Sequence, residues 1–354
     1  MKRFIYTALP TRVVFGSGTS AEVAQEVLRL GTSRVLLITG PDPRRRSAAV
    51  AVALGSLLVA RFDRATMNTP TDITARALEV AKANGVDCVV SVGGGSSTGL
   101  SKALAVRAGY LQVIVPTTYA GSEVTPVLGE TEGDIKTTRS SPDILPETVI
   151  YDPDLTLELP PDMTLTSAIN AMAHAVEAMY SSESNPVIDG MALQAIRSIT
   201  RALPVVIDHP RDDGGRAELL QSAWLAGVCM ASVGMGLHHK LCHVLGGTFG
   251  LPHAPTHTVV LPYVMSYNRS AVPEVIQRIA DAMQVSDAAV GLRDLVAQLG
   301  GPTSLQELGF RADDVQRAAE LAASDPYPNP RTVTRNDLVT LLGAALAGQH
   351  PSDS

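Results

Sequence analysis

The sequence predicts two parts: an N-terminal α/β domain built as a Rossmann-like, doubly wound parallel sheet, and an all-α C-terminal domain. Up to about residue 150, apolar runs alternate with helical stretches. An acidic, proline-rich stretch at 151–164 then breaks this rhythm, and the segments after it have helical spacing. We therefore expect an α/β domain of residues 1–155 and a helical domain of residues 156–354, with the cleft between them as the default ligand site.

Continuous apolar runs mark the expected strands, because a strand buried on both faces of a parallel sheet has no polar alternation. These runs cover 34–40, 87–95 and 110–118. Helical apolar spacing with a closing glycine covers 71–85 and 96–109, so strand and helix alternate as a doubly wound sheet requires. In the second half, helices are expected over 165–182, 186–204, 215–234, 272–284, 286–299 and 335–348.

Composition excludes several classes of protein. A hydrophobic fraction of 45% in 354 residues predicts a large core, and a net charge of −7 argues against a broad nucleic-acid footprint. The sequence has neither a signal-peptide core near its start nor an apolar run of membrane-spanning length. The three widely spaced cysteines, Cys88, Cys229 and Cys242, favour a reducing cytoplasm over a disulfide framework.

Glycines and hydroxyl groups follow two of the expected strands. Gly93, Gly94, Gly95 and Ser96 end one apolar run and open a helix, where close backbone approach and free N–H groups favour a pyrophosphate. The turn is not the G-x-G-x-x-G fingerprint, so a plain tight turn is the alternative. The next run is followed by TTYAGSE (117–123), at the end of a strand where open α/β sheets bind ligands.

Five of the eight histidines fall between Gly236 and His257. His239 and His243 share one helix face at a spacing of four, and Asn170 and His174 repeat this spacing in the first helix of the second half. Such crowding is typical of a metal site. Three neutral imidazoles and an amide, however, would bind a divalent transition metal weakly or not at all.

Several motifs in combination resemble the iron-containing (group III) alcohol dehydrogenase family. They are VVFG, GGGSS, PTT…GSEVT, LPETVIYDPDLTLELP, AxAHAVEA, HxxxHxLGG and PHA, and they span nearly the whole chain. The resemblance implies the dehydroquinate synthase-like, two-domain fold of this family. It places the family's metal ligands on Asn170, His174, His239 and His253, and its non-ligand histidine near the nicotinamide on His243.

The departures from the family pattern are informative. Asn170 stands where metal-dependent members have Asp, and TTYAGSE, with Tyr119, replaces the usual TTAGTGSE. With the local variants KTTR (136–139) and YPNPR (327–331), this combination resembles the maleylacetate reductase branch, which is regarded as not needing metal. That resemblance implies reduction of the C=C bond of maleylacetate, a small dianion, to 3-oxoadipate in bacterial aromatic degradation, with NADH or NADPH, by a homodimer.

The chemistry agrees with a site without metal. Hydride addition β to a ketone creates an enolate, which imidazolium and other hydrogen-bond donors can stabilise. We expect His243, as proton donor or enolate partner, and His239 to be catalytic. Weaker candidates for anion partners are Lys136 and Arg331. The expected substrate contacts are Tyr119, Asn170, His174 and His253. The expected cofactor contacts are Thr39, Gly40, Pro41, Gly93, Gly94, Gly95, Ser96, Thr117, Thr118, Ser122, Val124 and Lys136.

The cofactor preference is inferred from the residues after the first apolar run. Family members often carry an Asp there, which binds the adenosine ribose and disfavours a 2′-phosphate. This chain has Thr39-Gly40-Pro41 instead, followed by Arg44, Arg45 and Arg46. We therefore expect the enzyme to use NADH and to accept NADPH.

Three other interpretations are open. A metal-dependent alcohol or polyol dehydrogenase would need Asn170 to ligate through its carbonyl oxygen. A relative of the dehydroquinate synthase or glycerol-phosphate branches would be expected to keep an acidic ligand. A nucleotide-binding regulator that has lost catalysis would not need the glycine turn together with His243.

Overall fold

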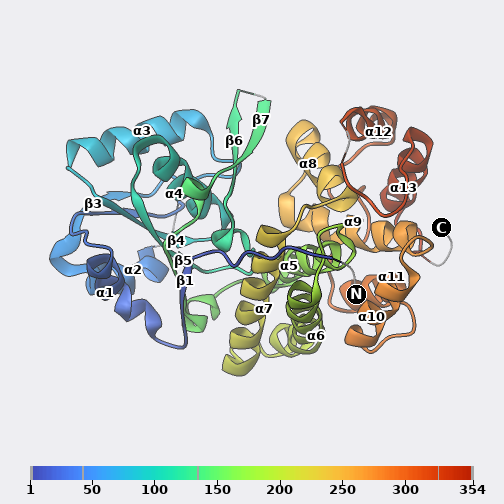
Figure 1. Ribbon diagram of the computed structural model, residues 1–354, viewed down its shortest axis with the longest axis horizontal. Helices are drawn as coiled ribbons and strands as arrows, with labels where there is room; N and C mark the ends of the chain where they lie inside the picture. The colour runs from blue at the N-terminus through green and yellow to red at the C-terminus, as the bar shows by residue number, and fades with distance from the viewer. Residues whose placement is uncertain (1–2, 42–43, 134, 326, 352–354) are drawn as a thin grey trace. The chain divides into compact units, whose positions relative to one another are not determined.

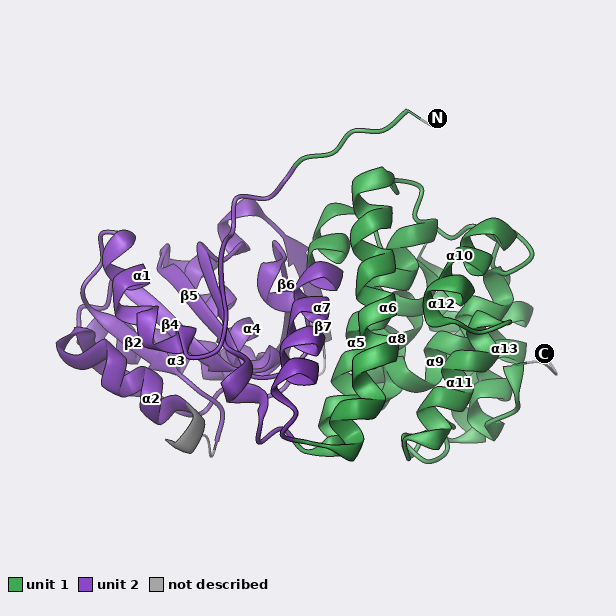
Figure 2. Cartoon of the chain, turned by 90° about the horizontal axis from the view of Figure 1, so that it is seen from below, with its two compact units in different colours: residues 1–7, 160–210, 228–354 green, residues 8–159, 211–227 purple. Residues whose placement is uncertain are grey.

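The computed structural model describes residues 3–41, 44–133, 135–325 and 327–351. The chain forms two compact units, which Figure 2 colours separately. We call residues 8–159 and 211–227 the α/β unit, and residues 1–7, 160–210 and 228–354 the helical unit. The main division at 159/160 lies four residues after the expected boundary at 155/156. The sequence pattern does not reveal that residues 211–227 join the first unit or that residues 1–7 join the second.

The α/β unit contains a parallel sheet, in which Figure 1 labels β1, β3, β4 and β5. The sheet has six strands in the order β1-β8-β5-β4-β2-β3. The three expected strands are confirmed as β2, β4 and β5. The other three are short, and two of them form the sheet edges, where the apolar pattern is weaker. The strands are β1 (Arg12–Phe15), β2 (Val35–Ile38), β3 (Leu58–Phe62), β4 (Cys88–Gly93), β5 (Leu111–Pro116) and β8 (Thr148–Tyr151).

Helices cover both faces of this sheet, as the doubly wound prediction requires. Alternate side chains of β2 point to opposite faces: Val35 and Leu37 pack with α1 and α2, whereas Leu36 and Ile38 pack with α3 and α4. The four helices are α1 (Val23–Arg29), α2 (Arg44–Leu54), α3 (Thr71–Ala83) and α4 (Gly95–Ala108). An antiparallel pair, β6 (Val127–Glu132) and β7 (Ile135–Ser140), is outside the main sheet.

The helical unit is built around α5 (Pro161–Tyr180), which is buried almost continuously from Thr164 to Tyr180. A helix buried all round belongs at the centre of a bundle, and α5 packs mainly against α6 and α9. The remaining helices are α6 (Pro186–Asp208), α7 (Asp213–Ser232), α8 (Leu237–Phe249), α9 (His253–Asn268), α10 (Pro273–Met283), α11 (Ala288–Gln298), α12 (Val315–Ser324) and α13 (Arg335–Ala347). By residue number, α7 starts in the α/β unit.

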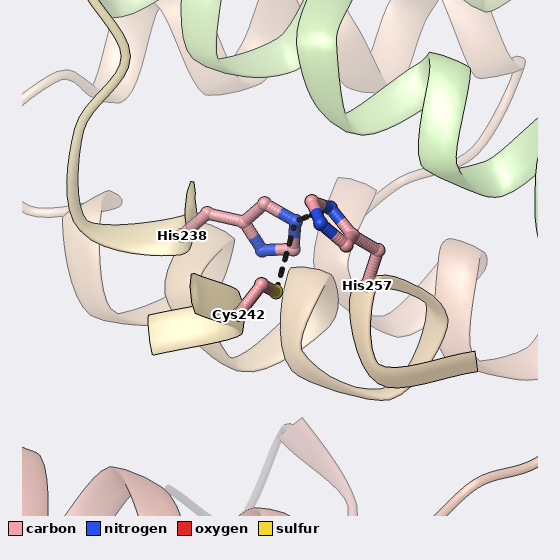
Figure 3. Close-up of side chains that lie close together, drawn as sticks. All are labelled: His238, Cys242 and His257. Carbon is pink, nitrogen blue, oxygen red and sulfur yellow. Dashed lines mark hydrogen bonds between the residues drawn. The ribbon is translucent and has the colours of Figure 1, made fainter. Parts of the chain in front are cut away.

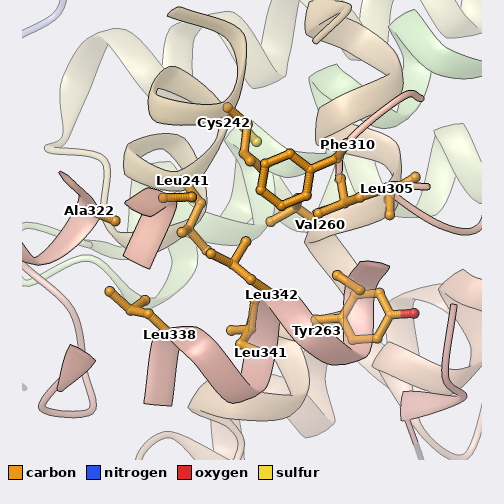
Figure 4. Packing of buried hydrophobic residues seen from close by; sticks show 14 of the residues in the cluster. Leu241, Cys242, Val260, Tyr263, Leu305, Phe310, Ala322, Leu338, Leu341 and Leu342 are labelled. Carbon is orange, nitrogen blue, oxygen red and sulfur yellow. The ribbon is translucent and has the colours of Figure 1, made fainter. Parts of the chain in front are cut away.

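A second apolar core joins α8 and α9 to α12 and α13. Figure 4 shows Leu241, Val260, Phe310, Leu338 and Leu342 packed together in it. The sequence predicts that Gly246 and Gly247, the two glycines of the HxxxHxLGG motif, break or cap α8, and this prediction is wrong. The helix continues through both and ends at Gly250, whose φ of +70° is the left-handed conformation that a glycine C-cap supplies.

The sequence predicts no membrane-spanning segment, and the helices of the described ranges can be searched for one. None of them alone combines the length and the hydropathy needed to cross a bilayer. Only α7 and α8 taken together, across a sharp bend, meet that measure.

Within the α/β unit, Gly227 on α7 lies against the loop that contains Gly121. A Cβ on Gly227 would overlap the Gly121 carbonyl oxygen and lie 2.7 Å from Val124 Cγ2. We predict that Gly227→Ala lowers the free energy of unfolding by about 1–3 kcal/mol, because backbone cannot yield as a flexible side chain does. Thermal unfolding followed by circular dichroism measures the change.

Gly190→Ala is the matched control, because a Cβ on Gly190 in α6 meets no atom within 4 Å. It should leave stability unchanged or raise it by up to about 1 kcal/mol through helix propensity. Equal melting temperatures for the two variants would contradict the close approach of Gly227 to Gly121.

Candidate active site

The glycine turn after β4 is held against the loop after β5. Gly93 ends β4 with φ +145°, and Gly94 is the N-cap of α4. The Thr117 N–H donates to the Gly93 carbonyl at 2.9 Å. A Cβ on Gly94 would lie 3.0 Å from the Thr118 side chain, so the second glycine lets the two loops meet. Two segments that the sequence assigns to cofactor binding are therefore neighbours.

The neighbouring strand β2 brings a third predicted segment to the same edge of the sheet. β2 is adjacent to β4, and Thr39, Gly40 and Pro41 follow its carboxyl end. The sheet order reverses between β2 and β4, which is where open α/β sheets bind ligands. The N-terminus of α4 adds N–H groups and positive dipole charge there, which favour a phosphate. The side chains of Lys136 and of Arg44, Arg45 and Arg46 lie outside the described residues.

Lys102, on α4, anchors the loop after β5. Its Nζ donates to the carbonyl oxygens of Ser122, Thr125 and Val127 at 2.6, 2.8 and 3.0 Å, and to Thr125 Oγ1 at 2.9 Å. Burial lowers the pKa of Lys102 to about 7, although these four acceptors favour the ammonium form. The anchored loop contains Ser122 and Val124, two predicted cofactor contacts. Lys102 is not among the residues predicted from the sequence, because most lysines are surface residues.

Two predicted substrate contacts have partners within their own units. Tyr119 has no exposed surface, its hydroxyl accepts from Arg216 Nη1 at 3.1 Å, and burial raises the pKa of its phenol. Arg331 is exposed, and its guanidinium lies 4.1 Å from the Tyr267 ring centroid. Its Nη1 also donates to the Tyr267 carbonyl at 3.1 Å. These contacts favour structural roles for both side chains over the predicted contact with substrate.

The histidines from three helices gather in the helical unit. The His239 ring on α8 lies 5.0 Å from that of His174 on α5, 6.2 Å from that of His243 and 5.0 Å from that of His257 on α9. His253 begins α9 and lies 4.4 Å from His257, measured between ring centroids. Asn170 lies one turn before His174 on α5.

The residues of the cluster differ in solvent exposure. The side chains of His243 and His253 are exposed, whereas Asn170, His174 and His239 are buried. A ligand can therefore approach the cluster from the side of His243 and His253. Burial and neighbouring imidazoles hold the pKa of His174 well below its usual value, so that ring is neutral at physiological pH.

A buried carboxylate, Glu177, organises the cluster. It lies on α5 and accepts from the backbone N–H groups of Gly236, His238 and His239 at 3.2, 2.9 and 3.3 Å. It therefore satisfies donors at the N-terminus of α8, where a negative charge is favourable. It also accepts from His239 Nδ1 at 2.5 Å. The sequence reasoning missed Glu177, although Asn170, His174 and Glu177 have the i, i+4, i+7 spacing of one helix face.

The bond to Glu177 fixes the tautomer of His239. Because Nδ1 carries the donated proton, Nε2 is the atom available to a ligand. His239 Nε2 and His174 Nδ1 are both buried, and neither has a hydrogen-bond partner among the described residues. Buried polar atoms without partners are costly, so these two nitrogens mark a place where a polar ligand would be stabilised.

The iron implied by the family resemblance fits this donor set poorly. Asn170, His174, His239 and His253 offer one amide and three imidazoles, with no anionic ligand to balance a dication. Glu177 is engaged by His239 and the α8 backbone. Among the described residues, the group whose ligand atoms all lie close together is instead His238, Cys242 and His257 (Figure 3).

Comparison with known proteins agrees with this architecture. The model of the iron-containing alcohol dehydrogenase family matches residues 10–153, and the C-terminal model of the same family matches residues 164–346. Maleylacetate reductase 1 of Rhodococcus opacus is 53% identical over 350 residues, which cover 99% of this chain and 98% of the relative.

Solved structures extend the comparison to the fold. The crystal structure of maleylacetate reductase from Agrobacterium tumefaciens is 48% identical, with a TM-score of 0.94 over 99% of this chain and 100% of that chain. A 1,3-propanediol oxidoreductase is 28% identical, with a TM-score of 0.91 over 98% of this chain and 100% of that chain. The chain therefore belongs to the iron-containing alcohol dehydrogenase family, and within it to the maleylacetate reductase branch.

Proposed function

We propose that this protein reduces the C=C bond of maleylacetate to give 3-oxoadipate, with NADH as the preferred reductant and NADPH accepted, and without a metal ion. One observation carries the proposal: Asn170, a neutral amide, stands beside a buried imidazole cluster in which Glu177 orients His239. Such a cluster can donate protons and hydrogen bonds, and without a carboxylate ligand it would hold a metal ion less tightly than the family's Asp-containing set. The full-length similarity to maleylacetate reductases supports the same substrate.

The reaction needs a site for developing negative charge. The nicotinamide, when bound, supplies a hydride to the alkene carbon β to the ketone. The alkene electrons move to the ketone oxygen as an enolate, and a proton then reaches the carbon α to the ketone. Hydrogen-bond donors placed around the ketone oxygen lower the energy of the enolate, and an imidazolium can deliver the proton.

We assign the proton donor to His239, in place of the sequence-based first choice, His243. With Nδ1 held by Glu177, a protonated His239 has its second N–H on Nε2, and the carboxylate stabilises the positive charge of the imidazolium. His243 is exposed and lies one turn further along α8, with its ring centroid 6.2 Å from that of His239. In this proposal it is a second hydrogen-bond partner of the substrate.

The remaining cluster residues bind the dianion. Asn170 offers an amide N–H₂, and His174 and His253 offer ring N–H groups. Neutral N–H donors suit a substrate with two carboxylates. Each of them stabilises the negative charge of a carboxylate, and none of them is a cation that would lose its own hydration on binding. The glycine turn and the Thr117–Thr118 loop are the proposed place of the cofactor pyrophosphate. The absence of a carboxylate at Thr39-Gly40-Pro41 supports tolerance of the 2′-phosphate of NADPH.

The alternative is a metal-dependent dehydrogenase that interconverts an alcohol and a carbonyl compound. The similarity to a 1,3-propanediol oxidoreductase is the observation that favours this alternative. It would require a Lewis acid to polarise the substrate oxygen, and hence a ligand set with stronger donors than those around Asn170.

Glu177→Gln tests the dyad. The amide keeps the shape of the carboxylate but no longer fixes the His239 tautomer or stabilises its positive charge. We predict a fall of about 10²–10⁴ in kcat with maleylacetate, followed by NADH absorbance. Glu183→Gln is the control, because Glu183 is an exposed carboxylate that accepts from the Gly234 N–H at 2.7 Å. The dyad is refuted if the two variants keep the same kcat.

Gly95→Ala tests the pyrophosphate site. A Cβ on Gly95 meets no protein atom within 4 Å, so the variant should fold with an unchanged melting temperature. A pyrophosphate at the N-terminus of α4 would nevertheless meet the added methyl group. We predict a rise of roughly tenfold in the Kd for NADH, about 1.4 kcal/mol, measured by fluorescence titration. Gly343→Ala in α13, which is equally open, should leave the Kd unchanged. Unaltered NADH binding by Gly95→Ala would place the cofactor elsewhere.

Chelation tests the absence of a metal requirement. Because the donor set carries no negative charge, we predict that dialysis against a strong chelator leaves kcat with maleylacetate unchanged and that the purified protein contains far less than one metal ion per chain. Asn170→Asp is the positive control: the added carboxylate should make Zn²⁺ or Fe²⁺ binding measurable by metal analysis. Stoichiometric metal in the unaltered protein, with activity lost on its removal, would disprove the proposal.

A further inference from the structure

Behind the proposed site lies a second polar group that the reaction described above does not use. His238 and Cys242 lie one turn apart on α8, and His257 faces them from α9 (Figure 3). His238 Nε2 is 2.9 Å from His257 Nδ1, and Cys242 Sγ is 3.7 Å from the same His238 Nε2. All three side chains are almost fully buried, at 0%, 1% and 0% exposure. A buried polar group of this kind needs a physical explanation.

A soft metal ion is one explanation, because the three ligand atoms lie within 4.8 Å of one another. The distances favour shared protons instead. Two imidazole nitrogens bound to one tetrahedral zinc at about 2.0–2.1 Å stand about 3.3 Å apart, whereas 2.9 Å is the usual length of a hydrogen bond between nitrogens. Burial also raises the pKa of the Cys242 thiol well above its usual value, so in this arrangement of rings the sulfur keeps its proton.

The protonated thiol sets the direction of the hydrogen bonds. A thiol that keeps its proton can donate to His238 Nε2, and in that direction Nε2 presents its lone pair. The His238 ring proton is then on Nδ1, a buried atom without a hydrogen-bond partner among the described residues. In this arrangement the donor of the 2.9 Å contact is His257 Nδ1–H, so this N–H and the thiol share one acceptor. A neutral His257 with its proton on Nδ1 has a lone pair on Nε2. That atom is buried and has no hydrogen-bond partner among the described residues.

His257 is also the ring around which the other imidazoles are arranged. It lies edge-on to His253 at 4.4 Å, to His239 at 5.0 Å and to His174 at 6.4 Å, measured between ring centroids. The lone pair on Nε2 therefore belongs to a ring that contacts the three imidazoles assigned to the substrate. Their orientation depends on how His257 is held.

We propose that Cys242, His238 and His257 form a buried hydrogen-bonded chain that fixes the proton of His257 on Nδ1, and that His257 is a positioning residue for His253 and His239. The role of the positioned imidazoles rests on the proposed function, whereas the chain itself does not. His257 touches neither hydride nor proton in this arrangement. It acts through the rings beside it.

The first test observes the chain without substrate. In the full-length protein labelled with ¹⁵N-histidine, two-bond ¹⁵N–¹H correlation spectra distinguish protonated from unprotonated ring nitrogens. We expect His257 to be protonated on Nδ1 and bare on Nε2, and Cys242→Ser, which retains an O–H donor, to give the same pattern. Cys242→Ala removes the donor and should shift His257 toward the other tautomer. A His257 proton on Nε2 in the unaltered protein would overturn the proposal.

The second test measures positioning. In His257→Asn the amide N–H can replace Nδ1–H toward His238, while Nε2 and the ring are lost. We expect a melting temperature close to that of the unaltered protein, an unchanged KM for NADH and a fall of about tenfold in kcat with maleylacetate. Cys242→Ala should lower kcat, and Cys242→Ser should restore it. Full kcat in His257→Asn, with the fold intact, would overturn the positioning role.

Added Co²⁺ decides between the chain and a metal site. We expect no thiolate-to-cobalt absorption band at stoichiometric Co²⁺, and a stoichiometric band that disappears in Cys242→Ala would overturn the hydrogen-bonded chain. The failure of the proposed function is recognised separately: an unaltered protein that shows the expected His257 tautomer but no turnover of maleylacetate refutes the substrate assignment and leaves the chain in place.

Discussion

The helical site depends on one buried carboxylate. Glu177 is 1% exposed and ties two helices together, because it lies on α5 and accepts from the first backbone N–H groups of α8. Burying a carboxylate is costly unless it is fully hydrogen-bonded, and here three backbone donors and His239 Nδ1 share the compensation. The same interaction that holds the helix therefore also orients the imidazole assigned to catalysis, so the fold and the reactivity of the site cannot be varied independently.

The second constraint is the neutrality of the remaining donors. Because Asn170 replaces the family's acidic ligand, the polar atoms around it can donate hydrogen bonds to an anion and compensate a dication less well than a carboxylate would. His174 Nδ1, and His239 Nε2 when that ring is protonated, can donate to a substrate with several oxygens, and neither nitrogen has a partner in the described structure. In the α/β unit, Lys102 plays the part that Glu177 plays in the helical unit. Its four hydrogen bonds hold the loop that contains the predicted cofactor contacts Ser122 and Val124. Each unit thus uses a buried ionisable side chain to fix the backbone beside its predicted ligand residues.

Much of this could be predicted from the sequence, because periodicity and glycine position report local structure. The strands β2, β4 and β5, the glycine turn and the faces of α5 and α8 follow from such patterns. Three-dimensional partners do not. The bond between Glu177 and His239 joins residues 62 positions apart, and the Tyr119–Arg216 contact joins residues 97 apart. Residues 211–227 follow the first helices of the second half in sequence but belong to the α/β unit. The helix α8 continues through Gly246 and Gly247. Both features depend on tertiary packing, which overrides local propensity.

In the proposed function, a histidine cluster oriented by a carboxylate directs reduction to a carbon–carbon double bond. The most direct measurement follows the hydride itself, with NADH deuterated at the transferred position of the nicotinamide and NMR analysis of the product. We expect one deuterium on the carbon β to an intact ketone, with a solvent-derived hydrogen on the α carbon. Deuterium on a carbon that carries a new hydroxyl group would mean carbonyl reduction and would refute the proposed function.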